Sequence, residues 1–209
     1  MRLMLVLSIF VSGLSAVAAV PLEKQQFILS KPTPQWFGER IALPPKGFAP
    51  DLGLKGIEEI LFAPGMFKAD QPDFFSYVFL FALEAKPILD AKVLKKELFT
   101  YYTGLSKARM GNPKLDTSQF RVKVNQFKKD MGVSPKDAEN IANYLAEVVW
   151  LEPFATKKMQ TLYFELQTWQ YKGSPYQYLF VCASPQKPDK PIWKTLRGIR
   201  AGVAIKPVK

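Results

Sequence analysis

Ile57–Glu84, IEEILFAPGMFKADQPDFFSYVFLFALE, is the stretch of the chain that decides the fold. Its two ends, Ile57–Ala63 and Phe74–Leu83, are rich in β-branched and aromatic residues and have the composition of strands. Pro64 and Gly65 open the loop between them. If Phe74–Leu83 is a strand, nearly all the side chains on both of its faces are apolar. This pattern predicts a central strand that is covered on both faces.

Further strands are indicated on both sides of this stretch by short apolar or alternating runs. Residues 144–152 fit either a helix or a strand. We favour a strand from about Ala146 to Pro153, because β-branched and aromatic residues predominate there and proline ends the run. The other strands that we expect are Phe37–Leu43, Ser118–Phe127, Gln160–Tyr171 and Tyr176–Ala183.

Three segments have helical patterns. The longest begins at Pro87 and covers roughly twenty residues, with apolar side chains on one stripe and an end at Gly104 or Gly111. The run Ser134-Pro135-Lys136-Asp137 has an N-cap residue followed by proline, which predicts a short helix to about Asn143. The last expected helix is Pro191–Arg200.

These elements predict an α+β fold. We expect an antiparallel sheet of about seven strands in the order β-β-β-α-β-(α)-β-β-β-α, with the helices packed on it. One domain would cover residues 36–200, after an extended lead-in over 20–35 and before a basic tail over 201–209. The parts 36–110 and 111–200 each end in a helix, which suggests two similar halves, although their residues do not match.

Residues 1–19 have the layout of a secretory signal peptide. Arg2 precedes the apolar run Leu3–Val11, and small residues follow up to Ala18 and Ala19, where we expect cleavage. The apolar run is too short to span a bilayer permanently. We therefore expect an exported protein, in the periplasm or outside the cell. A lipid anchor is not indicated, because no cysteine lies near the cleavage site.

The composition excludes several kinds of chemistry. The chain has a formal net charge of +11, which loss of Arg2 with the leader would lower to +10. It contains no histidine and one cysteine, Cys182, so Ser-His-Asp and Cys-His catalysis, imidazole metal sites and an internal disulfide are excluded. No phosphate-binding glycine loop or metal-ligand cluster occurs, and we expect no metal and no cofactor. We interpret Cys182 as a buried structural thiol.

Three glutamates are the candidates for carboxylate chemistry, Glu39, Glu58 and Glu152. Glu58 and Glu59 are adjacent on a strand and point to opposite faces, so they cannot share a site. A carboxylate turned into the core needs a cation or hydrogen-bond donors, and we expect Arg40 to pair with Glu58 or Glu39. A structural ion pair is the simpler interpretation, and a hydrolase or transferase is the alternative.

Large apolar residues in loops rich in proline and glycine are the most suggestive pattern for function. Such residues either cap an open end of the sheet core, which is the simpler interpretation, or form a recognition surface. We predict that ligand or partner contacts use Arg40, Glu58 and four of these loop residues, Trp36, Phe48, Met66 and Phe67. Two further loop residues of this kind are Phe37 and Leu52.

Basic residues form two groups, one on the strand Ser118–Phe127 and one near the C-terminus. A solvated face is the simplest interpretation, and binding of an anionic polymer or a membrane surface is the alternative. Nucleic acid is not an expected partner, because no nucleic-acid motif is present and an exported protein seldom meets nucleic acid. The residues that we predict on this basic surface are Arg121, Lys123, Lys194, Arg197 and Arg200.

The leading hypothesis is a secreted or periplasmic, non-catalytic binding protein. Aromatic loops on an antiparallel sheet would contact a small apolar ligand or a protein partner whose identity the sequence does not indicate. The first alternative is a carboxylate-dependent hydrolase or transferase. The second is a protein that binds polyanions or membrane surfaces through its basic face, in which case binding would weaken steeply as salt rises.

Overall fold

The computed structural model of the chain describes residues 28–129, 131 and 135–203. The expected signal peptide, residues 20–27 of the lead-in, Ser134 and residues 204–209 of the tail lie outside the described residues. Within the described ranges the chain forms a seven-stranded antiparallel sheet and two helices, in the order β-β-β-α-β-β-β-β-α. The expected α+β class and the antiparallel sheet are confirmed.

A meander of three strands and a helix begins the fold: β1 (Phe37–Leu43), β2 (Gly56–Phe62), β3 (Tyr77–Leu83) and α1 (Ala91–Arg109). The second part consists of β4 (Arg121–Phe127), β5 (Ala138–Leu151), β6 (Met159–Tyr171), β7 (Gln177–Ser184) and α2 (Ile192–Ala201). The strands lie in the order β1-β2-β3-β7-β6-β5-β4. Thus α1 carries the chain to the far edge of the sheet, and the last four strands return to its middle.

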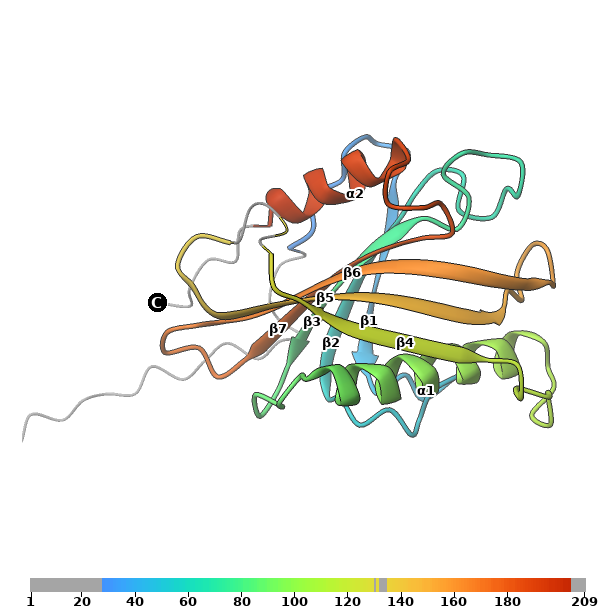
Figure 1. Cartoon of the computed structure of the whole chain (residues 1–209), viewed down its shortest axis with the longest axis horizontal. Helices are drawn as coiled ribbons and strands as arrows, with labels where there is room; N and C mark the ends of the chain where they lie inside the picture. The colour runs from blue at the N-terminus through green and yellow to red at the C-terminus, as the bar shows by residue number, and fades with distance from the viewer. Residues whose placement is uncertain (1–27, 130, 132–134, 204–209) are drawn as a thin grey trace, which may run out of the picture.

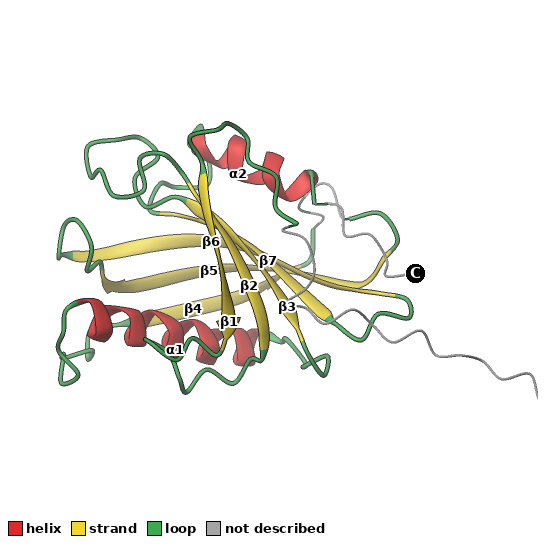
Figure 2. Cartoon of the chain, turned by 180° about the vertical axis from the view of Figure 1, so that it is seen from behind, coloured by secondary structure: helices red, strands yellow, loops and turns green. Residues whose placement is uncertain are grey.

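The two helices cover opposite faces of a twisted sheet (Figure 1; Figure 2). Helix α1 packs on β4 and β5, and α2 packs on β7 and β3. The side chains between the sheet and α1 include Phe79 and Trp150, and we call this cluster the α1-side core. Those between the sheet and α2 include Phe180 and Trp193 and form the α2-side core.

Strand β3 has the position that its sequence predicts. All seven of its residues are buried, because α1-side and α2-side side chains cover both faces. It pairs with β2 on one side and with β7 on the other. Phe74–Ser76, expected as the start of the strand, instead form the turn before it, in which Phe75 has a φ of 47°.

The short helix expected up to Asn143 is wrong, because Ala138–Leu151 is one long strand, β5. This strand pairs with β6, and the register shifts between Glu139 and Ala142. Asn140, within this irregularity, has a φ of 53°, which an α-helix does not allow. The N-cap pattern that predicts the helix is a local signal, and pairing with β6 overrides it. The strand expected from about Ala146 is therefore correct but begins earlier.

Helix α1 begins later than expected, and its end agrees with Gly111, one of the two glycines at which we expect it to end. It starts after Asp90, not at Pro87, and the Asp90 side chain accepts the Val93 amide hydrogen at 2.8 Å as an N-cap. It ends at Arg109, before Gly111 with a φ of 62°. Gly104 lies inside the helix, where the loop after β1 approaches it closely. Helix α2 matches its expected range within one residue.

The sheet runs without interruption through both expected halves. β3 belongs to the part 36–110 and β7 to the part 111–200, and these two strands pair antiparallel from Tyr77 opposite Ala183 to Leu83 opposite Gln177. The described elements therefore share one sheet, and an internal duplication stays a prediction.

Candidate functional site

Four phenylalanine rings lie in a row at the end of the sheet where β1 begins and β2 ends. We call Phe37, Phe62, Phe67 and Phe154 the aromatic strip. Ring centroids are 5.1 Å apart for Phe37 and Phe62, 6.3 Å for Phe37 and Phe67, and 5.5 Å for Phe67 and Phe154. Phe67 is 49% exposed and Phe37 is 38% exposed. The strip therefore exposes apolar surface to solvent. Its rings are also close enough to attract one another.

A tight loop between β2 and β3 holds Phe67 in place. The Gly65 amide donates to the Asp73 carboxylate at 2.9 Å, and the Phe75 amide donates to the Met66 carbonyl at 3.1 Å. The Met66 side chain is buried in the α1-side core, whereas its neighbour Phe67 faces solvent. These two predicted contact residues therefore differ in position: Met66 anchors the loop, and Phe67 is available for contact.

A carboxylate holds Phe154 in the turn between β5 and β6. Glu152 is buried and accepts amide hydrogens from Phe154, Ala155 and Thr156 at distances of 2.5 to 3.1 Å. These bonds make Glu152 a residue that shapes a turn. The Arg109 guanidinium lies 5.3 Å from the centroid of the Phe154 ring, so a cation contacts one end of the aromatic strip.

Three of these residues, Phe62, Phe154 and Arg109, are not singled out by the sequence pattern. Phe154 follows Pro153 in a hairpin turn. It therefore shares the property that identifies Phe67, a large apolar side chain in a loop or turn that contains proline. Phe62 and Arg109 end regular elements, and their position at the strip depends on how those elements pack.

Glu58 is fully buried in the sheet face that α1 covers, at 0% exposure. It lies opposite Ile41 of β1 and Phe81 of β3. Tyr101 of α1 donates its hydroxyl toward both carboxylate oxygens, at 3.1 and 3.2 Å. Among the described residues no ion pair includes Glu58. Burial raises the pKa of Glu58 to about 8, and the charge of Glu39 also raises it. The hydrogen bond from Tyr101 acts in the opposite direction and lowers this pKa.

Two more tyrosines complete a polar cluster around Glu58. The hydroxyls of Tyr77 and Tyr102 share a hydrogen bond, and burial raises the pKa of both phenols. The Phe48 ring packs edge-on against Tyr101, with centroids 5.0 Å apart. At neutral pH the cluster is therefore a set of uncharged hydroxyl and carboxyl groups enclosed by aromatic rings.

Arg40 pairs with Glu59, so the expected pairing with Glu58 or Glu39 is wrong. Arg40 and Glu59 are opposite each other in the β1–β2 register and form an ion pair. Glu59 also accepts two backbone amide hydrogens from the segment before β1, at 2.6 and 3.2 Å. Trp36 is buried in the α2-side core. Because Arg40 and Trp36 are on the other side of the sheet from Glu58, the six predicted contact residues do not form one site.

The predicted basic surface is also divided. Arg197 and Arg200 converge on Glu165, with nitrogen–oxygen distances of 2.6 and 2.9 Å. Arg200 is 3% exposed, so its expected place on the surface is wrong. Lys123 of β4 is opposite Glu147 of β5, and that solvated face therefore carries both signs of charge. The other two predicted basic residues, Arg121 and Lys194, are exposed.

Cys182 is fully buried on β7, as expected for a structural thiol. Burial raises the pKa of its thiol to about 12, although the nearby Arg200 charge acts in the opposite direction. In residues 28–129, 131 and 135–203 no group of three potential ligand side chains could hold a metal ion. Neither helix described here is both long and apolar enough to cross a membrane.

Comparisons with models of known protein families, with curated proteins and with solved structures find no match for this chain.

Proposed function

We propose that the protein is an exported, non-catalytic binding protein, and that the aromatic strip contacts an apolar ligand or the apolar side chains of a partner. The observation that supports this proposal is the exposure of Phe67 and Phe37 within a row of rings that the loop and turn hydrogen bonds hold in place. Single exposed apolar side chains are ordinary, whereas apolar side chains that adjoin on the surface are characteristic of interaction sites.

The geometry of the strip favours binding for an energetic reason. A partner that covers an aromatic ring removes apolar area from water, and each fully buried phenylalanine contributes on the order of 2 kcal/mol. Rings that already contact one another lose little conformational freedom on binding. The entropic cost of ordering them therefore offsets less of the free energy gained by burial. Arg109, beside Phe154, adds a charged rim that favours one orientation of the partner.

Carboxylate catalysis at Glu58 is the second candidate function, favoured by the raised pKa of this group. A general acid must reach its substrate, and Glu58 has no exposed surface. Its Tyr101 partner is itself covered by Phe48. Binding at the aromatic strip does not require the core to open, and we prefer it for this reason.

The proposal can be tested with the neutral fluorescent probe N-phenyl-1-naphthylamine. We expect fluorescence enhancement that is nearly independent of salt. Phe67→Ala and Phe37→Ala should each weaken binding at least tenfold, as expected for loss of about 2 kcal/mol of apolar contact. Ile88→Ala, which removes another exposed apolar side chain at 82% exposure, is the matched control and should bind as the original protein does.

Two results would contradict the proposal. One is equal binding of the probe by Phe67→Ala, Phe37→Ala and the control. The other is turnover of a substrate that Glu58→Gln abolishes without a loss of thermal stability, because a carboxylate role would then replace the non-catalytic one.

A further inference from the structure

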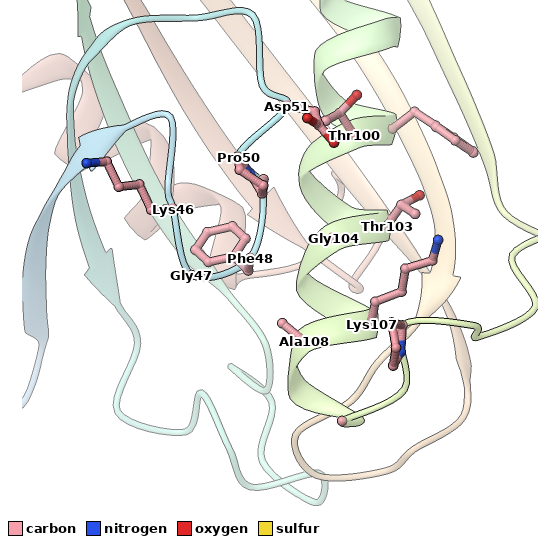
Figure 3. A pocket seen from close by; sticks show the side chains of 14 residues that line it. Lys46, Gly47, Phe48, Pro50, Asp51, Thr100, Thr103, Gly104, Lys107 and Ala108 are labelled. Atoms are coloured by element: carbon pink, nitrogen blue, oxygen red, sulfur yellow. The ribbon is translucent and has the colours of Figure 1, made fainter.

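A groove runs between the loop after β1 and the outer side of α1 (Figure 3). Its volume is about 680 Å³, which is within the range of small-molecule sites. The loop contributes one wall through Lys46, Phe48 and Pro50, and α1 contributes the other through residues that include Lys107 and Ala108. None of the aromatic-strip residues lines it, so this groove is a separate site.

Close packing fixes the width of the groove. At Gly104 the backbone of the loop approaches α1 so closely that a Cβ on this glycine would overlap the Phe48 carbonyl oxygen. The Phe48 ring is held against Tyr101, and Ala49 and Leu52 are buried in the α1-side core. The loop is therefore held in place by its contacts with α1 and with the α1-side core. The groove is formed before any ligand binds.

The charges in the groove are unevenly placed. Lys46 and the Phe48 ring lie on the loop side, Lys107 lies on the helix side, and Asp51 lies beside Thr100 at the other end of the helix face (Figure 3). Thr100 and Lys107 are seven residues apart on α1, which is about 10 Å along the axis. No ion pair among the described residues uses Lys46, Lys107 or Asp51. The lining therefore includes two lysines and one acid, and the Lys46 ammonium points away from α1, so Lys107 is the cation on the helix side.

We propose that this groove binds a small amphipathic anion, with an anionic head group at Lys107 and an aromatic or branched aliphatic body against Phe48 and Ala108. Charge complementarity selects the anion, because Lys107 supplies a positive charge at the end of the lining away from Asp51. Repulsion by Asp51 places the head group at the Lys107 end. This inference does not depend on the aromatic strip.

The test uses 8-anilinonaphthalene-1-sulfonate, an aromatic sulfonate whose fluorescence rises in apolar sites, with the full chain at low and high salt. We expect saturable binding that weakens as salt rises. Lys107→Ala should weaken binding about fivefold, as expected for loss of one partly exposed ion pair. Ala108→Trp should fill the groove and abolish binding, and Asp51→Asn should strengthen it. Lys123→Ala, which removes an exposed lysine on β4, is the matched control.

The outcomes separate this site from the aromatic strip. Weaker sulfonate binding by Lys107→Ala and its loss in Ala108→Trp, with unchanged binding by Phe67→Ala, would support the groove, whatever the neutral probe does. Binding that is lost in Phe67→Ala and retained in Lys107→Ala would place the dye on the strip and overturn the inference. Equal binding by all variants, or none by the original protein, would also overturn it. Thermal unfolding followed by circular dichroism verifies that each variant is folded.

Discussion

The Tyr101 hydroxyl of α1 lies 3.1 and 3.2 Å from the two carboxylate oxygens of Glu58 on β2, in a fully buried part of the α1-side core. This contact joins helix α1 to the strand next to the sheet edge. Among the described residues, Tyr101 is the one side chain that donates a hydrogen bond to the Glu58 carboxyl. Because a single neutral donor does not compensate the burial of a charge, the carboxyl keeps its proton at neutral pH.

The stability of the protein should depend on pH through Glu58. Its pKa is about 8 in the folded protein, against an ordinary value of 4.5. The folded protein thus keeps a proton that the unfolded chain releases. The resulting contribution to the free energy of unfolding is fully present below pH 4.5 and is lost as pH rises through 8, by up to about 1.4 kcal/mol per pH unit. Glu58→Gln should match the original protein near pH 5 and exceed its stability at pH 9.

Urea unfolding at several pH values between 5 and 9 measures this difference. Glu147→Gln, which changes an exposed glutamate on β5, is the control and should follow the original protein throughout. Parallel curves for the original protein and Glu58→Gln would contradict a raised pKa at Glu58.

Tyr101→Phe should destabilise the protein more at high pH than at low pH. The variant loses the hydrogen bond that lowers the pKa of Glu58, so this pKa should rise further. Near pH 6 we expect a loss of about 1 kcal/mol, typical of one neutral hydrogen bond, and near pH 9 a larger loss, because the ionised carboxylate has no donor. A double-mutant cycle with Glu58→Gln should abolish the difference between the two pH values, and a difference that persists would assign the effect to packing.

Two glycines inside helices should respond oppositely to the same substitution. Gly104→Ala places a Cβ against the Phe48 carbonyl oxygen, and we expect a loss of about 1–3 kcal/mol and a displaced loop. Gly198→Ala in α2 meets no atom within 4 Å and should increase stability by about 0.5–1 kcal/mol through helix propensity. Thermal unfolding checks both variants, and similar effects at the two sites would refute the close approach at Gly104.

The ion triad of Glu165, Arg197 and Arg200 should contribute far more than an exposed ion pair, because Glu165 and Arg200 are buried even though Arg197 is partly exposed. Glu165→Gln leaves Arg197 and Arg200 without their counter-charge, and we expect a loss of about 3 kcal/mol or more. Lys190→Gln removes an exposed pair with Asp189 and should cost less than about 1 kcal/mol. Chemical unfolding at moderate salt measures both changes. If raising the salt concentration removed most of the Glu165→Gln effect, the Glu165–Arg200 pair would be accessible to solvent.

Cys182 should react with a thiol reagent only after the protein opens. The side chain is fully buried, and burial raises the pKa of its thiol to about 12, so the folded protein has almost no thiolate at pH 8. Labelling with a thiol-specific disulfide reagent should therefore be slow in buffer and fast in denaturant. Rapid labelling in buffer would show that the region around β7 opens readily.

Some local patterns in the sequence predict the structure well. Phe74–Leu83 is apolar on both faces, and such a run is stable only between two layers, so β3 is found buried on both sides. The stripe of α1 and the range of α2 follow from helical spacing in the same way. The segment before Ala146 was predicted wrongly, because its N-cap pattern favours a helix locally, whereas its strand conformation depends on pairing with β6.

The candidate site could be predicted only in part. An apolar loop residue such as Phe67 is visible as an exception to ordinary loop composition, and the structure places it on the surface. Its neighbours in the aromatic strip come from β1, β2 and the β5–β6 turn, and no spacing in the sequence relates these segments. The groove beside α1 depends likewise on the meeting of a loop with Gly104.

The sequence by itself determined the α+β class, the doubly covered strand β3 and the burial of Cys182, because composition and period dictate which side chains must leave water. Only the tertiary structure decided that Arg40 pairs with Glu59, that Glu58 meets Tyr101 and that Arg200 is buried beside Glu165. Those contacts depend on strand register and on the packing of helices against distant strands. A charged residue finds its partner through this three-dimensional arrangement, and its chain neighbours do not specify it.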